Sequence, residues 1–332
     1  MRKSAICLLL IFLLTLSGCA GQDQQYSITH LTLFDTVTTI TGTAASQDEF
    51  QSEAKQIYDV LLEYHQLFDI YNDYEGLNNL KTVNENAGIA PVAVDRKIID
   101  LLQDCRTYYE QTDGTVNVAM GSVLQLWHEA RQAETAALPD AAALAQAALH
   151  CSWDTVVIDE SAGTVYLSDP QQRLDVGAIA KGWAAERVAE AAPSGYLLSL
   201  GGNVVATGPK TQQGAPWVVG VTDPDGGAYL HTLNLSDGSI VTSGDYQRYY
   251  EVDGVRYHHI IDPQTGYPSM YWRSVTVICE DSGLADALST ALFVMDLESG
   301  KALLEQCGAH AMWVDAEGTL HYSSGFEAYI KD

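Results

Sequence analysis

Two adjacent histidines, His258 and His259, stand in the stretch VRYHHIIDPQTGYP, which occupies residues 255–268. The residues before them alternate around Asp253-Gly254, a dipeptide typical of tight β-hairpin turns. Neighbouring residues on a strand point to opposite faces, so one imidazole is expected to face inward and the other outward. A neutral imidazole can accept a proton from a hydroxyl near pH 7. The pair is therefore either structural or the source of a general base, and other residues must decide.

Two further segments contain groups that bind metals or anions. In GLADALSTALFVM, Asp286 and Thr290 are four residues apart, so a carboxylate and a hydroxyl share one helix face. Oxygen donors of this kind suit Mg²⁺, although a solvated aspartate and a helix-interior threonine are equally common. In DVGAIAKG, Asp175 and Lys181 flank a turn into a helix, where exposed amides and a lysine favour an anion. The phosphate-loop spacing is absent, and a helix-entry turn with a surface lysine is the alternative.

Helices and strands inferred from periodicity must position these groups. Apolar residues at helical spacing predict helices after the capping residues Ser46 and Asp95, a third over about 118–131, and a fourth from about residue 138. From Trp153 onward, alternating segments predict mainly hairpins, with helices at DVGAIAKGWAAERVAEAA and GLADALSTALFVM. LTLFDTVTTITGT and YLLSLGGNVVATG are each predicted to be a single strand. Hairpins outnumber parallel crossovers, so the predicted class is α+β.

The first residues, MRKSAICLLLIFLLTLSGCAG, have the charged start, short apolar run and small residues of an export signal. LSGC resembles the cleavage box of bacterial lipoproteins, in which Cys19 becomes the lipidated first residue; an ordinary signal peptide is the alternative. We expect residues 1–18 to be the signal, 19–30 a tether, and 31–332 a single domain. Acyl chains would then hold the protein at a membrane surface outside the cytoplasm, on the outer face of the cell membrane or the periplasmic side.

Charge and cysteine content limit the possible functions. The formal net charge of −26 repels nucleic acid and does not support polybasic docking to a membrane. Hydrophobic residues make up 47% of the chain, enough for a large core. Cys105, Cys151, Cys279 and Cys307 are widely spaced and show no metal-site spacing. They are predicted to be buried thiols, with one disulfide as the alternative.

Several motifs in order resemble the FAD:protein FMN transferases, the ApbE-like family. DVGAIAKG, SLGGNVVATG, the segment from TSGDYQRYY to DPQTGYP, and ADALSTALFVM carry the resemblance. FDTVTTI, YNDYEGLNNLKTVNENAG and TDGTVNVAMGSVLQLW are similar to its N-terminal blocks, so the likeness covers nearly all of the mature chain. It implies a T-fold-related α+β domain with mostly antiparallel sheets. It also implies Mg²⁺-dependent transfer of the FMN half of FAD to a threonine hydroxyl of a partner protein, with release of AMP.

The resemblance also implies roles for individual residues. His259, directly before two aliphatic residues and Asp-Pro, would be the catalytic base, whereas His258 would be structural. Asp286 and Thr290 would bind Mg²⁺ through their side chains, and Ala178 through its backbone carbonyl. The residues implied at the FAD site are Phe34, Tyr71, Val116, Asn117, Val118, Asp175, Lys181 and Ile260.

The sequence departs from the family pattern at two places and leaves other functions open. Phe34 stands where many members have methionine, and Ser289 replaces an aspartate that some members offer to the metal. The same parts would serve an FAD pyrophosphatase that gives FMN and AMP. A non-catalytic flavin- or solute-binding lipoprotein and a flavin electron carrier are further alternatives. Partners implied by the family are extracytoplasmic proteins with an FMN-binding domain, such as subunits of sodium- or electron-pumping complexes, modified in trans.

Overall fold

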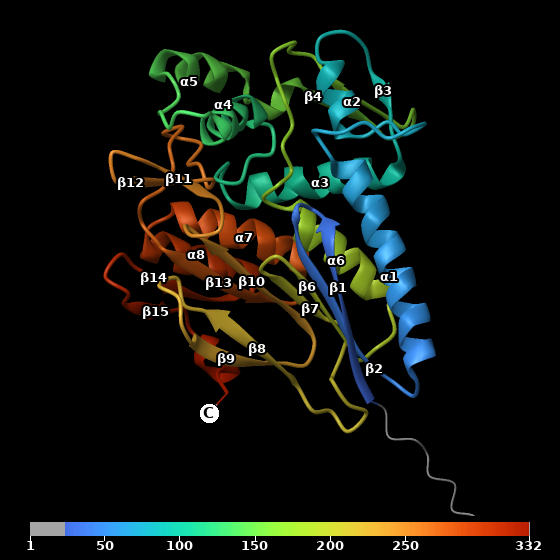
Figure 1. Ribbon diagram of the computed structural model, residues 1–332. Helices are drawn as coiled ribbons and strands as arrows, with labels where there is room; N and C mark the ends of the chain where they lie inside the picture. The colour runs from blue at the N-terminus through green and yellow to red at the C-terminus, as the bar shows by residue number, and fades with distance from the viewer. Residues whose placement is uncertain (1–23, 332) are drawn as a thin grey trace, which may run out of the picture.

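An eight-stranded antiparallel sheet is the centre of the computed structural model, which describes residues 24–331 (Figure 1). Its strand order is β1-β2-β6-β7-β10-β13-β14-β15. The strands are β1 Gln24–Leu33, β2 Thr36–Ala44, β6 Tyr196–Leu200, β7 Asn203–Ala206, β10 Gly238–Gly244, β13 Ser274–Cys279, β14 His310–Val314 and β15 Leu320–Tyr322. Every neighbouring pair is antiparallel, which confirms the predicted α+β class with mostly antiparallel sheets.

Four helices cover one face of this sheet, and a hairpin covers the other. The helices are α1 Gln47–Phe68, α6 Ala180–Ala191, α7 Ser282–Val294 and α8 Leu297–Cys307, and the hairpin is β8 Trp217–Thr222 with β9 Tyr229–Leu235. As predicted, Ser46 caps α1 by accepting a hydrogen bond from the Glu49 amide, and apolar residues at helical spacing are buried beneath it. Asp281 caps α7 in the same way through the Leu284 amide.

A smaller part lies above the sheet in the view of Figure 1. It contains α2 Leu80–Glu85, α3 Arg96–Gln111, α4 Gly121–Gln132 and α5 Ala141–Ala147, with β3 Val92–Ala93, β4 Val156–Asp159 and β5 Thr164–Leu167 in a three-stranded sheet. The predicted helices after Asp95, near residue 118 and near residue 138 are all present, the second beginning at Gly121. The predicted hairpin after Trp153 is the pair β4–β5.

The hairpin that carries the two histidines is a separate two-stranded sheet, β11 Tyr249–Val252 with β12 Val255–His258. Its turn residue Asp253 has a φ of 52° and Gly254 a φ of 78°, as the Asp-Gly pair predicts. Trp127 of α4 packs against Tyr257 and Tyr267 at ring-centroid distances of 6.0 and 5.6 Å. An aromatic cluster therefore fastens this hairpin to α4.

Three expectations about the chain are corrected by the structure. LTLFDTVTTITGT does not form one strand: it contains the end of β1, a turn at Phe34-Asp35, and β2. YLLSLGGNVVATG likewise forms two strands, β6 and β7, joined by a turn at Gly201 and Gly202. Residues 24–30, expected in the tether, pair with β2 instead, because polar side chains are tolerated on an outer strand exposed to water. The short helix α2 and helix α8 were not predicted. The signal segment and Cys19 lie outside the described residues.

The four cysteines of the described residues are free thiols, with Cys105 buried and the other three half-buried. The prediction of thiols is thus confirmed, and the prediction of full burial holds for Cys105 alone. No helix within residues 24–331 is long and apolar enough to cross a membrane.

Candidate active site

His258 is a fully engaged structural histidine. Its ring lies 2.6 Å from the carbonyl oxygen of Ser269 through Nε2, and Nδ1 accepts the Ile260 amide at 3.2 Å. The first contact needs a proton on Nε2 and the second needs a lone pair on Nδ1, so the two bonds select one neutral tautomer. Only 4% of the residue is exposed. His258 has no ring nitrogen left for a reaction, in agreement with the structural role expected for it.

His259 follows the end of β12 and, unlike His258, has a ring nitrogen that is not used in a hydrogen bond within the described chain. Its backbone amide donates to the Arg248 carbonyl at 3.1 Å, which fixes the start of the side chain. The ring nitrogen Nδ1 is buried, and no group among residues 24–331 bonds to it. Burial, assisted by the positive charges of Arg248, Lys181 and Arg131, lowers the pKa of His259 to about 3. The imidazole is therefore neutral at pH 7.

A base with so low a pKa would be weak, but the cause of the shift indicates how it changes. After burial, the positive charges of Arg248, Lys181 and Arg131 all act to lower this pKa. An anion bound among these cations would offset them and raise the pKa of His259 toward the range useful for proton transfer. The site therefore gains basicity when an anionic ligand enters it.

Asp286 lies on α7 where that helix meets the start of α6. It is 3% exposed, and its Oδ2 accepts the Gly182 amide at 2.9 Å and lies 3.4 Å from the Lys181 ammonium. A Cβ at Gly182 would fall 2.2 Å from the Ser282 carbonyl oxygen. The glycine therefore allows α6 and α7 to approach closely enough for its amide to hold the carboxylate.

The contact with Asp286 also leaves a backbone oxygen free. In a regular helix the Gly182 amide would donate to the carbonyl of Ala178, four residues earlier. Here it donates to Asp286, and no hydrogen bond within the described chain uses the Ala178 carbonyl. Thr290 lies one helical turn after Asp286 and is half-buried. A carboxylate, a free carbonyl and a hydroxyl fit a hard divalent cation such as Mg²⁺.

No three His, Cys, Asp or Glu side chains gather into a metal-binding cluster within residues 24–331. A cation at Asp286 would therefore depend on a single carboxylate. Ser289 is already engaged, because its hydroxyl donates to the Asp286 carbonyl at 2.9 Å and shares a hydrogen bond with Ser243. This serine therefore stabilises α7 in the structure.

Asp175 and Tyr71 are two further residues that the sequence analysis expected at the FAD site. Asp175 is anchored by its amide to the Val118 carbonyl at 2.8 Å, and burial raises the pKa of its carboxyl group. Burial and the charge of Asp175 raise the pKa of Tyr71 to about 12, so the two side chains lie near one another. Tyr71 is 51% exposed and stacks on His128 with ring centroids 5.1 Å apart. One face of its ring is thus covered by protein.

The other residues expected at the FAD site have more structural roles. Val116, Val118 and Ile260 are buried in the core. The Asn117 side chain is used within the protein, donating to the Cys151 carbonyl at 3.0 Å and accepting the Ala119 amide at 2.9 Å. Phe34 occupies the tip of the β1–β2 hairpin.

Two arginines at the site escaped the sequence analysis. Burial and the charge of Arg248 lower the pKa of Arg131, and both arginines act electrostatically on His259 and Asp175. Within the described chain, neither guanidinium forms an ion pair with a carboxylate. Two neighbouring cations that lack carboxylate partners favour an anionic ligand.

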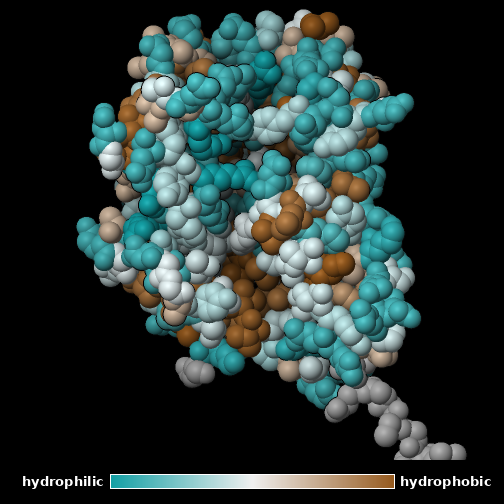
Figure 2. Space-filling model, in the orientation of Figure 1, coloured by the Kyte–Doolittle hydropathy of each residue, from teal (hydrophilic) through white to brown (hydrophobic). Residues whose placement is uncertain are grey.

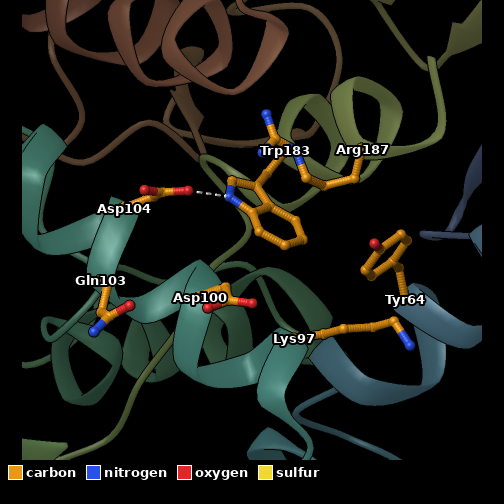
Figure 3. A pocket seen from close by; sticks show the side chains of 7 residues that line it. All are labelled: Tyr64, Lys97, Asp100, Gln103, Asp104, Trp183 and Arg187. Atoms are coloured by element: carbon orange, nitrogen blue, oxygen red, sulfur yellow. Dashed lines mark hydrogen bonds between the residues drawn. The ribbon is translucent and has the colours of Figure 1, made fainter. Parts of the chain in front are cut away.

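The surface is hollowed where the smaller part meets the sheet, and hydrophilic side chains follow the hollow (Figure 2). A separate recess of about 290 Å³ lies between α1, α3 and α6 (Figure 3). Its lining is Tyr64, Lys97, Asp100, Gln103, Asp104, Trp183 and Arg187. Asp104 accepts the Trp183 indole proton at 2.7 Å, and Lys97 pairs with Glu63. None of the predicted site residues lines this recess, so we do not assign the reaction to it.

Comparisons with known proteins agree with this geometry. The model of the ApbE family matches residues 34–313. An FAD:protein FMN transferase of Treponema pallidum is 33% identical over 96% of this chain and 93% of its own length. One from Klebsiella pneumoniae is 36% identical over 73% of this chain and 77% of its own length. The crystal structure of the ApbE protein of Thermotoga maritima superposes with a TM-score of 0.84, at 32% identity, over 93% of this chain and all of that one.

The Vibrio cholerae flavin transferase ApbE gives a TM-score of 0.77 at 25% identity, over 92% of this chain and 99% of that one. Fold, site and relatives together define the class of the protein, which is an enzyme of the transferase type. The chain belongs to the ApbE family.

Proposed function

We propose that this protein transfers the FMN half of FAD to a threonine hydroxyl of a partner flavoprotein, with Mg²⁺, and releases AMP. The observation that carries the proposal is the neutral imidazole of His259, with an unbonded nitrogen, next to two arginines without carboxylate partners. A proton acceptor beside an anion site is what attack by a hydroxyl on a diphosphate requires. The relatives named as FAD:protein FMN transferases support the choice of anion.

Each residue has a defined task in this reaction. Arg131, Arg248 and Lys181 hold the diphosphate, and His259 accepts the proton of the attacking hydroxyl. The threonine oxygen forms a bond to the FMN phosphorus, and the anhydride bond between the two phosphorus atoms breaks. AMP leaves with the electron pair of that bond, and His259 then releases its proton to it or to water. Mg²⁺, when bound by Asp286, Thr290 and the Ala178 carbonyl, supplies positive charge to the phosphoryl oxygens.

The proposal is tested by incubating the protein with FAD and Mg²⁺, with and without an FMN-binding domain of a candidate partner. Intact mass of the acceptor and AMP release are measured together. A mass gain equal to FMN, dependent on Mg²⁺, supports the transferase. AMP release without labelling, repeated with several acceptors, supports an FAD pyrophosphatase, a reaction that solvent access to the half-exposed Tyr71 side of the site favours. Tight FAD binding with neither product contradicts both.

Alanine at Arg131 or Arg248 is expected to raise the KM for FAD by about 10- to 100-fold, with a smaller effect on kcat. A charge-assisted hydrogen bond contributes about 1.5–3 kcal/mol, which corresponds to that range. Steady-state kinetics with varied FAD measure the effect. Arg96→Ala is the matched control, because Arg96 is exposed and pairs with Asp100 on α3. An unchanged KM in both site variants would contradict a diphosphate site at these arginines.

We further propose that the protein is anchored outside the cytoplasm through a lipid on Cys19 and acts there on partners with an FMN-binding domain. The support is the LSGC motif after a short apolar run. Metabolic labelling with a tagged fatty acid is expected to mark the wild-type protein and to fail in Cys19→Ala. Equal labelling of both proteins would contradict the anchor.

A further inference from the structure

The β1–β2 hairpin ends in a turn that is unusual for its residues. Phe34 and Asp35 have φ values of 51° and 52°, in the left-handed region that favours glycine. This conformation costs L-residues about 1–2 kcal/mol each, and it is rarest for bulky side chains such as phenylalanine. Such strain persists only where the surroundings impose it, and it is frequent at ligand-binding sites. Something in the structure must therefore hold the turn.

A chain of three side chains holds it. The Phe34 amide donates to Nδ1 of His65 at 3.2 Å, and the two rings pack edge to face with centroids 5.6 Å apart. His65 Nε2 lies 3.5 Å from the Tyr74 hydroxyl, which donates to Asp69 Oδ2 at 2.8 Å. Because Tyr74 donates its own proton to Asp69, its oxygen is left to accept from Nε2. The chain thus selects the neutral tautomer of His65 with a free lone pair on Nδ1.

Asp69 is a firm anchor for this chain. Burial alone would raise the pKa of Asp69, but hydrogen bonds from Asn72, Tyr71 and Tyr74 outweigh it and hold the pKa below its usual value. The carboxylate therefore stays ionised. Its Oδ1 accepts the Tyr71 amide at 2.6 Å and the Asn72 amide at 3.0 Å. One carboxylate thus fixes the segment that carries Tyr71 and, through Tyr74 and His65, the turn that carries Phe34.

The hydrogen bonds of His65, Tyr74 and Asp69 join the Phe34 turn to the segment of Tyr71. Tyr71 stacks on His128, whose Nδ1 lies 3.1 Å from the Arg131 guanidinium. We propose that His65 is a positioning residue, which sets Phe34 against Tyr71 so that the two receive the flavin rings. This inference rests on the proposed function.

Two variants separate positioning from general stability. His65→Asn places an amide oxygen near the position of Nδ1 and so keeps a hydrogen-bond acceptor there, whereas His65→Leu removes the acceptor at similar volume. FAD affinity by flavin fluorescence, KM, kcat and the thermal midpoint are measured at pH 7.5. At pH 7.5 the Leu variant is expected to bind FAD about three- to tenfold more weakly than wild type, the value of one hydrogen bond, with kcat at saturating FAD little changed. The Asn variant is expected to match wild type.

An Asn variant that keeps the wild-type thermal midpoint but binds FAD several-fold more weakly would overturn the inference, even if the Leu variant fails to fold. If wild type transfers FMN and a folded Leu variant leaves FAD affinity and KM unchanged, the inference fails and the proposed function stands. If wild type neither binds nor consumes FAD, the proposed function fails first.

Discussion

Replacement of His259 by alanine is expected to reduce the rate of FMN transfer by about 10²–10⁴-fold, the usual value of general-base catalysis. The reason is that the His259 ring has a buried nitrogen without a partner, in a neutral imidazole on which three cationic side chains act. FAD binding should change little, because the proposed function assigns the diphosphate to those cations. Single-turnover transfer at saturating FAD, together with direct FAD binding, measures the two effects separately.

His150→Gln is the matched control for this experiment. His150 is also partly buried, but it pairs with Asp169 at 2.7 Å outside the proposed site. The His150→Gln variant should transfer FMN at the wild-type rate. Retention of most activity in His259→Ala would show that the hydroxyl loses its proton by another route. Because the pKa of His259 is about 3, its protonation should not lower kcat/KM of the wild type at any pH above 5.

Conversion of Asp286 to asparagine is expected to abolish Mg²⁺-dependent transfer, with a loss of about 10²-fold or more at millimolar Mg²⁺. In the wild type the Gly182 amide donates to Asp286 Oδ2 at 2.9 Å. The amide oxygen of asparagine can still accept this hydrogen bond, so the contact between α6 and α7 is expected to survive. What disappears is the one negative charge next to the Ala178 carbonyl and Thr290. A cation site with a single carboxylate loses most of its affinity with that charge. A titration of activity with Mg²⁺ should show the midpoint moving to much higher concentration.

Glu186→Gln provides the comparison for Asp286→Asn. Glu186 is a second carboxylate between the same two helices, where it accepts the Ser282 amide at 2.7 Å, and burial raises its pKa. Neutralising it should leave the Mg²⁺ midpoint unchanged. If the two variants shift the midpoint equally, the effect belongs to helix packing, and the cation site must be sought elsewhere.

Helix-capping residues and the Asp-Gly turn pair correctly predicted the helices and the hairpin that depend on them. Ser46 and Asp95 cap helices as expected, and Asp253-Gly254 turns the hairpin before His259. The Phe34-Asp35 turn was missed because neither residue is glycine or asparagine. Its left-handed backbone is held by His65, which is 31 positions away in the chain. A turn imposed by tertiary contacts leaves no local signal.

The site likewise contains some features that local sequence predicts and others that depend on tertiary contacts. Asp286 and Thr290 could be paired from their spacing on one helix, and the family likeness pointed to Ala178. Sequence alone could not show why the Ala178 carbonyl is free, since that depends on the Gly182 amide turning to another helix. Nor could it select Arg131 and Arg248 among the basic residues. What distinguishes these two is that, besides lacking a carboxylate partner among the described residues, they act on both His259 and Asp175, and this proximity exists only in the folded chain.

The placement of the β11–β12 hairpin has a consequence for how the enzyme fails. The hairpin is outside the eight-stranded sheet, and side-chain contacts join it to the rest: Trp127 packs on Tyr257, the Tyr250 hydroxyl donates to the Ala137 carbonyl, and His258 bonds the Ser269 carbonyl. Two-stranded sheets are only marginally stable by themselves, so this hairpin can detach at a free-energy cost below that of global unfolding. Asp286, buried under the main sheet's helices, would persist in such a state. Mild heating would then silence catalysis reversibly in molecules whose core is intact.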